Sequence, residues 1–137
     1  MRIVLDTNVL VSALWKPQGP PGVLVRGLAD GRLQPVLSPV ILAEYHEVLA
    51  RRRFNFDQKR VSQILSFIQL IGVVVQGASS GRRLPDTTDL PFLDAALEAG
   101  AAYIVTGNFK DFPAEECVPV KPVGPAKFLA RWTGSQA

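Results

Sequence analysis

The sequence predicts an α/β protein with a mainly parallel sheet and helices on both of its faces. Short apolar runs alternate along the 137 residues with segments whose apolar residues recur at helical spacing. An uninterrupted apolar run of strand length is typical of a strand buried on both faces. Strands that alternate with helices form parallel sheets, and the connecting helices cross over in the right-handed sense.

The N-terminal part of the chain predicts two strands and two helices. Residues 3–5 form the first apolar run, and residues 33–37 form the second. Helices are expected between them at residues 9–14 and 23–29, on either side of a loop rich in proline and glycine. Such a loop interrupts helical structure, so the two helices are expected to be separate.

Two helices with clear starting residues follow. Ser38 and Pro39 are typical of an N-cap followed by proline at the first helical position, and the helix is expected to reach the basic residues 51–53. Its apolar stripe consists of Ile41, Tyr45, Val48 and Leu49. Asp57 is expected to cap the next helix, and Gly72 is expected to end it.

The next elements complete the predicted sheet. Residues 73–75 form a third strand, and residues 77–83 form a basic loop that is expected to be flexible. A helix that starts at residue 88 or 89 and stops at Gly100 leads into a fourth strand at residues 103–106.

The C-terminal part predicts an edge strand and a last helix. The edge strand is expected at residues 118–120 and the helix at residues 126–132. Residues 1–132 are therefore expected to form a single domain, followed by a loose tail at residues 133–137.

Composition restricts the class of protein. With 47% hydrophobic and 20% charged residues, the chain is an ordinary globular protein. No apolar stretch approaches the roughly 20 residues of a membrane span, and the first strand leaves no room for a signal peptide. The single cysteine, Cys117, excludes an internal disulfide and a cysteine-cluster metal site. These points favour the cytoplasm, and the net charge of +3 is compatible with a polyanion partner without proving one.

Polar side chains follow two of the predicted strands. Asp6 follows the first strand, and Asn108 and Asp111 follow the fourth. In a parallel sheet these turns open on the same carboxyl edge, where α/β proteins place ligand sites. Taken alone, Asp6 is more often a helix cap than a ligand, and the other acids shift that balance.

Two further acids lie on predicted helices. Asp89 starts the helix that leads into the fourth strand, and Glu44 interrupts the apolar stripe of the helix after Ser38. A carboxylate at the margin of a core is costly unless it is compensated, and a hard divalent cation such as Mg²⁺ compensates several carboxylates at once. Without a cation, clustered carboxylates repel one another and retain protons.

Other kinds of site are poorly supported. The sequence contains no phosphate-binding loop and no glycine-rich dinucleotide motif after the first strand. The single histidine, His46, has no serine or cysteine in a nucleophile elbow to activate.

Four segments of the chain together resemble a PIN domain, and most closely the VapC-like toxins of bacterial and archaeal toxin–antitoxin pairs. The segments are residues 4–9, the pair Glu44-Tyr45, residues 89–96 and residues 105–112. The resemblance extends from residue 2 to about residue 130. Each motif is weak by itself, and their order at domain-sized spacing makes the signal specific.

The resemblance implies a Mg²⁺- or Mn²⁺-dependent ribonuclease on a three-layer α/β/α PIN-like fold. Asp6, Glu44 and Asp89 match the three acids that bind the metal in the family. The fourth acidic position is taken by either Asn108 or Asp111, and the sequence leaves open which of the two fills it. It also leaves open whether one or two metals bind.

Three further residues are expected near the site by the same resemblance. Asn8 and Thr106 match residues that orient the carboxylates or the attacking water. Asp94 is expected only as an extra contributor, because five residues along a helix place it about 140° around the axis from Asp89.

Basic residues suggest where partners bind. They form two groups: Arg51, Arg52, Arg53, Lys59 and Arg60 between two helices, and Arg82 and Arg83 in the basic loop. These residues either contact an RNA backbone or form solvated helix ends, and the sequence favours neither. The resemblance also implies a homodimer and a small antitoxin whose tail covers the acidic site. Trp15 serves such an interface or completes the core.

Two other functions stay open. The alternatives to a toxin ribonuclease are a catalytically weak PIN module that binds RNA or protein, as Asn108 would allow, and a housekeeping RNA-processing nuclease without an antitoxin. If Asn108 only holds a water, Asn108→Asp raises metal affinity and preserves cleavage, which is the outcome we expect from sequence. If its amide donates to a neighbouring carboxylate, the same change lowers both.

Overall fold

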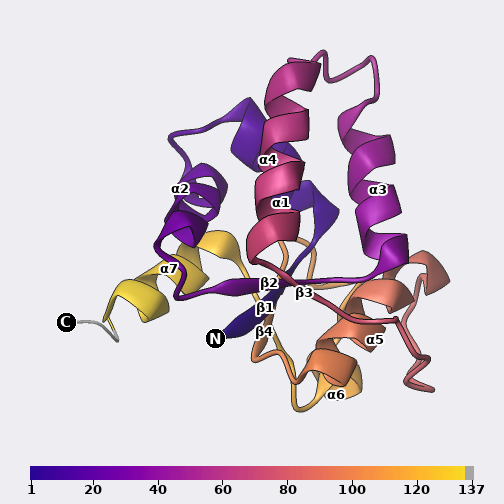
Figure 1. Ribbon diagram of the computed structural model, residues 1–137. Helices are drawn as coiled ribbons and strands as arrows, with labels where there is room; N and C mark the ends of the chain where they lie inside the picture. Colours follow the sequence, from indigo (N-terminus) through magenta and orange to yellow (C-terminus); the bar gives the residue numbers. More distant parts are fainter. Residues whose placement is uncertain (135–137) are drawn as a thin grey trace.

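The computed structural model describes residues 1–134 and contains a central five-stranded sheet (Figure 1). The strands are β1 (Arg2–Leu5), β2 (Gln34–Leu37), β3 (Val73–Val74), β4 (Tyr103–Val105) and β5 (Lys121–Val123). Their order across the sheet is β3-β2-β1-β4-β5, and every neighbouring pair is parallel. The parallel α/β sheet predicted from the sequence is therefore confirmed.

Helices cover both faces of this sheet. They are α1 (Thr7–Trp15), α2 (Pro20–Gly27), α3 (Pro39–Leu49), α4 (Gln58–Ile71), α5 (Leu90–Ala99), α6 (Ala114–Cys117) and α7 (Pro125–Gly134), with 3₁₀ turns η1 (Leu28–Asp30) and η2 (Thr87–Asp89). Figure 1 shows α1, α3 and α4 on one side of the sheet and α5 and α6 on the other, so the fold has three layers. Among the helices of residues 1–134, none has the length and apolar character needed to cross a bilayer.

The two central strands, β1 and β4, lie in the middle of the core. Ile3, Val4 and Leu5 on β1 and Ile104 and Val105 on β4 are fully buried. A strand between two layers of helices has no solvent-facing side, which is why its residues are apolar without alternation. The packed core therefore holds the carboxyl ends of β1 and β4, where the turns after these strands begin.

Predicted caps set the ends of three helices. The Ser38 hydroxyl accepts a hydrogen bond from the backbone N–H of Ile41 at 3.3 Å, and the Asp57 carboxylate accepts one from Lys59 at 3.1 Å. Gly100 ends α5 with a φ of 65°, a left-handed conformation that suits glycine. These three predictions are confirmed.

The edge strand expected at residues 118–120 is wrong, because β5 lies at Lys121–Val123. Residues 118–120 form a turn in which the Val120 N–H donates to the Cys117 carbonyl at 2.9 Å. Pairing with β4 begins at Lys121, whose N–H donates to the Ala102 carbonyl at 3.1 Å. Pro122 is tolerated in the middle of β5 because the strand lies at the sheet edge, where a missing N–H breaks no second ladder.

Two other C-terminal features differ from the prediction. The short helix α6 was not predicted, because four residues are too few to show a helical period. The last helix continues to Gly134, so residues 133 and 134 belong to α7 and not to a loose tail. The rest of the predicted tail, residues 135–137, lies outside the described residues.

The strand order reverses at β1, and this reversal marks where a ligand site is expected. From β1 the chain proceeds to β2 and β3 on one side and then returns to β4 on the other side of β1. In sheets of this kind a crevice forms beyond the carboxyl ends of the two strands at the reversal. Here those two strands are β1 and β4, so a ligand site is expected beyond their carboxyl ends.

Candidate functional site

Four carboxylates at the carboxyl ends of β1 and β4 and on the neighbouring helices lie close enough to affect one another's protonation. Asp6 follows β1, Glu44 lies on α3, Asp89 ends η2 and Asp111 follows β4. Asp6, Glu44 and Asp111 each repel the charge on Asp89, and Glu44 and Asp111 repel the charge on Asp6. We call these four residues the acidic crevice.

Asp6 is the most buried member of the acidic crevice, with 6% of its surface exposed. Its backbone N–H donates to the Val105 carbonyl at 3.0 Å, which continues the pairing of β1 with β4 by one residue. Its carboxylate accepts a hydrogen bond from the buried Thr106 hydroxyl at 2.8 Å. Burial raises the pKa of Asp6, and repulsion from Glu44 and Asp111 adds to that rise, while the bond from Thr106 opposes it.

Glu44 is held beside Asp6 by a neighbouring hydroxyl and by the residue that follows it on α3. The Thr7 hydroxyl, directly after Asp6, donates a hydrogen bond to Glu44 Oε2. The next residue, Tyr45, is buried and donates its hydroxyl proton to the carbonyl of Leu5 on β1. Burial, followed by the charges of Asp6 and Glu44, raises the pKa of Tyr45, so its hydroxyl stays protonated and keeps α3 attached to β1.

Asp89 is the least compensated carboxylate of the crevice. It is half-buried, and no described residue donates a hydrogen bond to its side chain. Burial raises the pKa of Asp89 to about 7, and the charges of Asp111, Asp6, Asp86 and Glu44 contribute in that order. A carboxyl group that remains protonated close to neutral pH is typical of a functional site.

Asn108 and Asp111 form one unit in the turn after β4. The Asn108 side-chain amide donates to Asp111 Oδ2 at 2.7 Å, and the Asn108 backbone N–H donates to the Thr106 hydroxyl at 3.0 Å. The sequence-based expectation that Asn108 only holds a water does not match this geometry, because its amide orients the neighbouring carboxylate. Thr106 thus connects the Asn108 turn to Asp6.

The donors around the acidic crevice leave oxygens available for a cation. Within residues 1–134, the second carboxylate oxygens of Glu44 and Asp111 accept no hydrogen bond, and neither do the oxygens of Asp89. Carboxylate oxygens are the ligands that Mg²⁺ and Mn²⁺ prefer, and the mutual repulsion is what such a cation relieves. The donor set therefore fits a hard divalent cation in chemistry and charge. In geometry, no three His, Cys, Asp or Glu side chains of the described chain already converge as a metal-binding group.

Two of the predicted neighbours lie elsewhere or act differently. Asn8 contributes its backbone N–H to the Asp6 carboxylate, and its side chain is exposed. Asp94 faces the loop before α5, where it accepts hydrogen bonds from the backbone N–H of Ser80, at 3.0 Å, and from the Ser80 hydroxyl. The structure therefore does not bring Asp94 to the acidic crevice.

Some of the predicted RNA-binding arginines form hydrogen bonds or ion pairs within residues 1–134, and others do not. Arg82 donates to the carbonyls of Glu116 and Val118 at 3.0 and 2.9 Å, so it fastens the loop at residues 77–83 to α6. That loop was expected to be flexible and is instead anchored, since α5 also holds it through Asp94 and Glu98. Arg83 is exposed.

Arg51, Arg52 and Arg53 lie in the loop between α3 and α4, whereas Arg60 lies on α4. Arg51 pairs with Glu47 one helical turn earlier, at 2.9 Å. The guanidinium of Arg53 lies 4.9 Å from the centre of the Phe54 ring. Arg52 is exposed, and its side chain makes no hydrogen bond or ion pair within residues 1–134.

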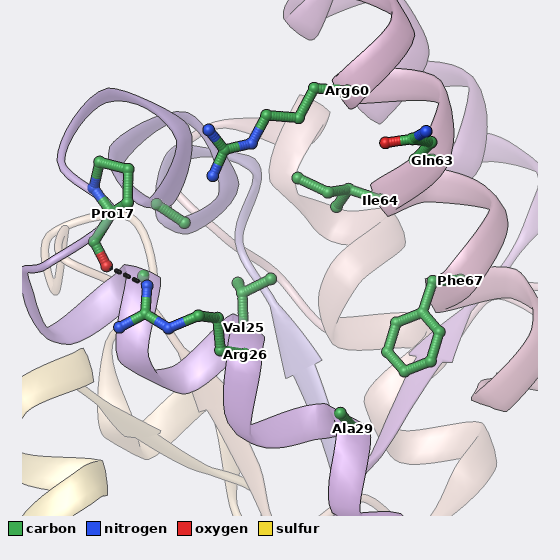
Figure 2. Close-up of a pocket in the computed structure, with 10 residues that line it drawn as sticks. Pro17, Val25, Arg26, Ala29, Arg60, Gln63, Ile64 and Phe67 are labelled. Atoms are coloured by element: carbon green, nitrogen blue, oxygen red, sulfur yellow. Dashed lines mark hydrogen bonds between the residues drawn. The ribbon is translucent and has the colours of Figure 1, made fainter.

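A separate cavity of about 520 Å³ lies between α4 and the helices α1 and α2 (Figure 2). Its lining is mainly apolar, including Val25, Ile64 and Phe67, with Arg60 entering from α4. The Arg26 guanidinium, also at this cavity, donates to the Pro17 carbonyl. Among the described residues no acid lines the cavity, so it is distinct from the acidic crevice.

Three contributors to the acidic crevice were not identified from the sequence. Thr7 orients Glu44, Tyr45 joins α3 to β1, and Asp86 adds negative charge near Asp89. Thr7 could have been found as a hydroxyl next to an acid at a strand end. Tyr45 could not, because its place in an apolar stripe conceals the role of its hydroxyl.

Comparison with known proteins identifies the family. A family model described as a PIN domain matches residues 2–110. An uncharacterized protein of Methanocaldococcus jannaschii, MJ1680, is 29% identical over 111 residues, which are 79% of this chain and 71% of the relative. The fold is similar to the crystal structure of VapBC2 from Rickettsia felis bound to a DNA fragment from their promoter, with a TM-score of 0.59 and 18% identity over 90% of this chain and 98% of that one. Because the family model covers more than half of its length, this chain belongs to the PIN domain family.

Proposed function

We propose that this protein is a divalent-metal-dependent endoribonuclease that hydrolyses RNA phosphodiester bonds at the acidic crevice. The observation that carries the proposal is Asp89, whose pKa is raised to about 7 by burial and by surrounding carboxylates at the reversal point of the sheet. PIN domains are generally nucleases, and membership of the family supports the same class of reaction.

Asp6, Glu44 and Asp89 are the residues proposed to hold Mg²⁺ or Mn²⁺, with the fourth position filled by the Asn108–Asp111 pair. When bound, such a cation lowers the pKa of a coordinated water and offsets negative charge on the phosphate. The chain itself keeps the carboxylates oriented: Thr106 holds Asp6, Thr7 holds Glu44 and the Asn108 amide holds Asp111. Such supporting donors fix both the direction and the basicity of ligands.

We further propose that the protein is the toxin of a toxin–antitoxin pair. The fold similarity to VapBC2 supports an antitoxin as the partner. The acidic crevice is the surface that this small antitoxin is proposed to cover. A homodimer and a cytoplasmic location are part of the same proposal.

The test is cleavage of structured and unstructured RNA in Mg²⁺, in Mn²⁺ and in EDTA. We expect cleavage with either metal, none in EDTA and none by Asp6→Asn. Glu98→Gln is the matched control, because Glu98 is a carboxylate on α5 that contacts the loop before the helix and not the crevice. Cleavage that persists in EDTA, or that Asp6→Asn retains, contradicts the proposal and points to a contaminating nuclease.

A further inference from the structure

Trp15 is the last residue of α1 and is 60% exposed, although it is one of the largest apolar side chains of the chain. Its ring nevertheless has neighbours within the chain, because two rings of the loop between α3 and α4 contact it edge to face. The centre of Phe54 lies 5.6 Å from that of Trp15 at 78°, and the centre of Phe56 lies 6.3 Å away at 87°. Trp15 is thus an exposed indole supported on one side by two other aromatic rings.

The two supporting rings are themselves engaged. Phe54 and Phe56 stack with centres 5.3 Å apart and planes 11° apart, and the Arg53 guanidinium lies 4.9 Å from the centre of Phe54. Phe54 and Phe56 are half-buried, so Trp15 presents the accessible aromatic surface. A hollow of about 210 Å³, lined by Ser12, Trp15 and Lys16, lies beside the indole.

Positive charge accompanies this aromatic group. Lys16 follows Trp15, and Arg51, Arg52 and Arg53 precede Phe54. Of these four cations, only Arg51 has a carboxylate partner within residues 1–134, and that partner is the exposed Glu47. We call this set the aromatic–basic surface; it consists of Trp15, Lys16, Arg51, Arg52, Arg53, Phe54 and Phe56.

The aromatic–basic surface is joined to the acidic crevice by α1. The helix begins at Thr7, which contacts Glu44, and ends at Trp15, which contacts Phe54. With a rise of about 1.5 Å per residue, the eight steps from Thr7 to Trp15 cover about 12 Å. Stacked nucleotides spaced by about 3.4 Å cover that distance in three to four residues.

We propose that the aromatic–basic surface is a subsite at which Trp15 stacks on an unpaired base of single-stranded RNA, three to four nucleotides from the phosphate at the acidic crevice. This inference rests on the proposed nuclease function. Every base has a face that stacks on an aromatic ring, and Lys16 and Arg52 contact the phosphates on either side. A base within a duplex is already stacked, so the subsite selects unpaired RNA.

Charge favours RNA over a protein partner at this surface. An exposed aromatic ring alone could bind either RNA or a protein. Lys16 and Arg52, on the two segments beside the indole, add positive charge that favours RNA, because RNA carries a phosphate at every nucleotide. The Arg53 guanidinium already makes a cation–π contact with the Phe54 ring, so cations and aromatic rings lie together at this surface.

The experiment measures binding without cleavage. Asp6→Asn protein in EDTA is titrated into a fluorescently labelled 12-nucleotide single-stranded RNA and into the same sequence as a duplex. We expect Trp15→Ala to weaken single-strand binding about 5- to 150-fold, which is the range for losing one stacked base. Trp15→Phe should stay within about threefold, because it keeps a ring. Leu70→Ala, which removes a side chain that is 82% exposed on α4, should change nothing.

Two further readouts keep the inference testable if Trp15→Ala folds poorly. In a Trp132→Phe background Trp15 is the sole tryptophan, and stacking on a base should quench its fluorescence. The double variant Lys16→Ala and Arg52→Ala should reduce the slope of log affinity against log salt by about 1.4, or about 0.7 for each phosphate that the protein no longer neutralises.

The outcomes separate this inference from the proposed function. Trp15-dependent binding without metal-dependent cleavage supports the subsite and contradicts the nuclease. Metal-dependent cleavage with unchanged binding by Trp15→Ala and no quenching of Trp15 contradicts the subsite alone. Equal affinity for the duplex overturns the inference, and so does a Trp15→Ala variant that loses self-association while it binds RNA normally, because the surface is then a protein interface.

Discussion

The two ends of α5 carry carboxylates in opposite electrostatic settings. Asp89, just before the helix, receives no hydrogen bond from the described residues, and burial and neighbouring carboxylates raise its pKa to about 7. Glu98, near the other end, accepts hydrogen bonds from the backbone N–H groups of Ala78, Gln76 and Gly77 at 2.7 to 3.0 Å. These donors, that of Ala78 foremost, lower the pKa of Glu98.

The difference separates a carboxylate that is compensated within the chain from one that is not. Glu98 is compensated within the chain, and its role is to hold the loop at residues 76–78 on α5. Asp89 is surrounded by like charge, and nothing in residues 1–134 compensates it. A charge arrangement of this kind is stabilised only by a proton or by an added cation. Variants of the two carboxylates and of their neighbours can therefore show whether that cation is a catalytic metal.

The largest effect is expected from exchanging the two acids of α5 for their amides. Asp89→Asn should lower metal-dependent RNA cleavage by at least about a hundredfold, since a catalytic metal supplies several kcal/mol of charge stabilisation. Glu98→Gln keeps an oxygen acceptor for the loop and should cleave like the wild type. Single-turnover rates at saturating Mg²⁺ measure both. Equal losses in the two variants would indicate a general effect on folding and remove the distinction.

Thr106→Val should weaken Mn²⁺ binding about 10- to 100-fold, the usual cost of removing a residue that orients a metal ligand. The change removes the hydroxyl that donates to Asp6 and accepts from the Asn108 N–H. Because the bond from Thr106 lowers the pKa of Asp6, its loss should raise that pKa further. A Mn²⁺ titration at pH 7 gives the affinity, with Thr106→Ser as the control that retains the hydroxyl. Normal binding by Thr106→Val would exclude this orienting role.

Asn108→Asp should lower Mn²⁺ affinity and cleavage by a few-fold, about threefold to tenfold. The substitution removes the amide that donates to Asp111 Oδ2 and places a like charge there. Asp111→Asn is the paired variant, and its loss of activity would identify Asp111 as the fourth acid. Tighter Mn²⁺ binding by Asn108→Asp would contradict this prediction and support the expectation from the sequence, that Asn108 only holds a water.

The smallest effect is a change of stability with pH in the absence of divalent metal. The raised pKa of Asp89 means that the folded protein binds this proton more tightly than the unfolded chain between about pH 4 and pH 7. The free energy of unfolding should therefore fall as pH rises through that window. Urea unfolding in EDTA at several pH values measures it, and Asp89→Asn should show a shallower decline. Identical slopes for the two proteins would show that Asp89 does not retain its proton in the fold.

Much of the fold could be predicted because its signals are local. The apolar runs of β1 and β4, the Ser38–Pro39 helix start and the Gly100 stop each depend on a few adjacent residues, and each was located correctly. The edge strand was placed three residues too early, because Val118 and Val120 are strand-compatible residues that form a turn, while β5 contains a proline. Edge strands tolerate such residues, so local preference is least informative there.

The residue types of the candidate site could also be predicted, but its interactions could not. Asp6 and the Asn108 turn follow from strand ends that meet at one sheet edge. The bond between Thr7 and Glu44 joins residues 37 positions apart, and that between Thr106 and Asp6 joins residues 100 apart, so neither has a sequence pattern. Asp94 is a different case. Its spacing from Asp89 did not show where its carboxylate lies, whereas its hydrogen bonds to Ser80 place it at the loop before α5.

The most direct test of the metal site is calorimetric titration of Mn²⁺ into the wild type, Asp89→Asn and Glu98→Gln at about pH 6.5, in two buffers with different heats of protonation. The wild type and Glu98→Gln should bind Mn²⁺ and release protons on binding, because Asp89 is partly protonated at this pH and must ionise to act as a ligand. Asp89→Asn should bind more weakly and release fewer protons. Absence of Mn²⁺ binding by the wild type, or identical affinity and proton release in all three proteins, would contradict a metal site at the acidic crevice.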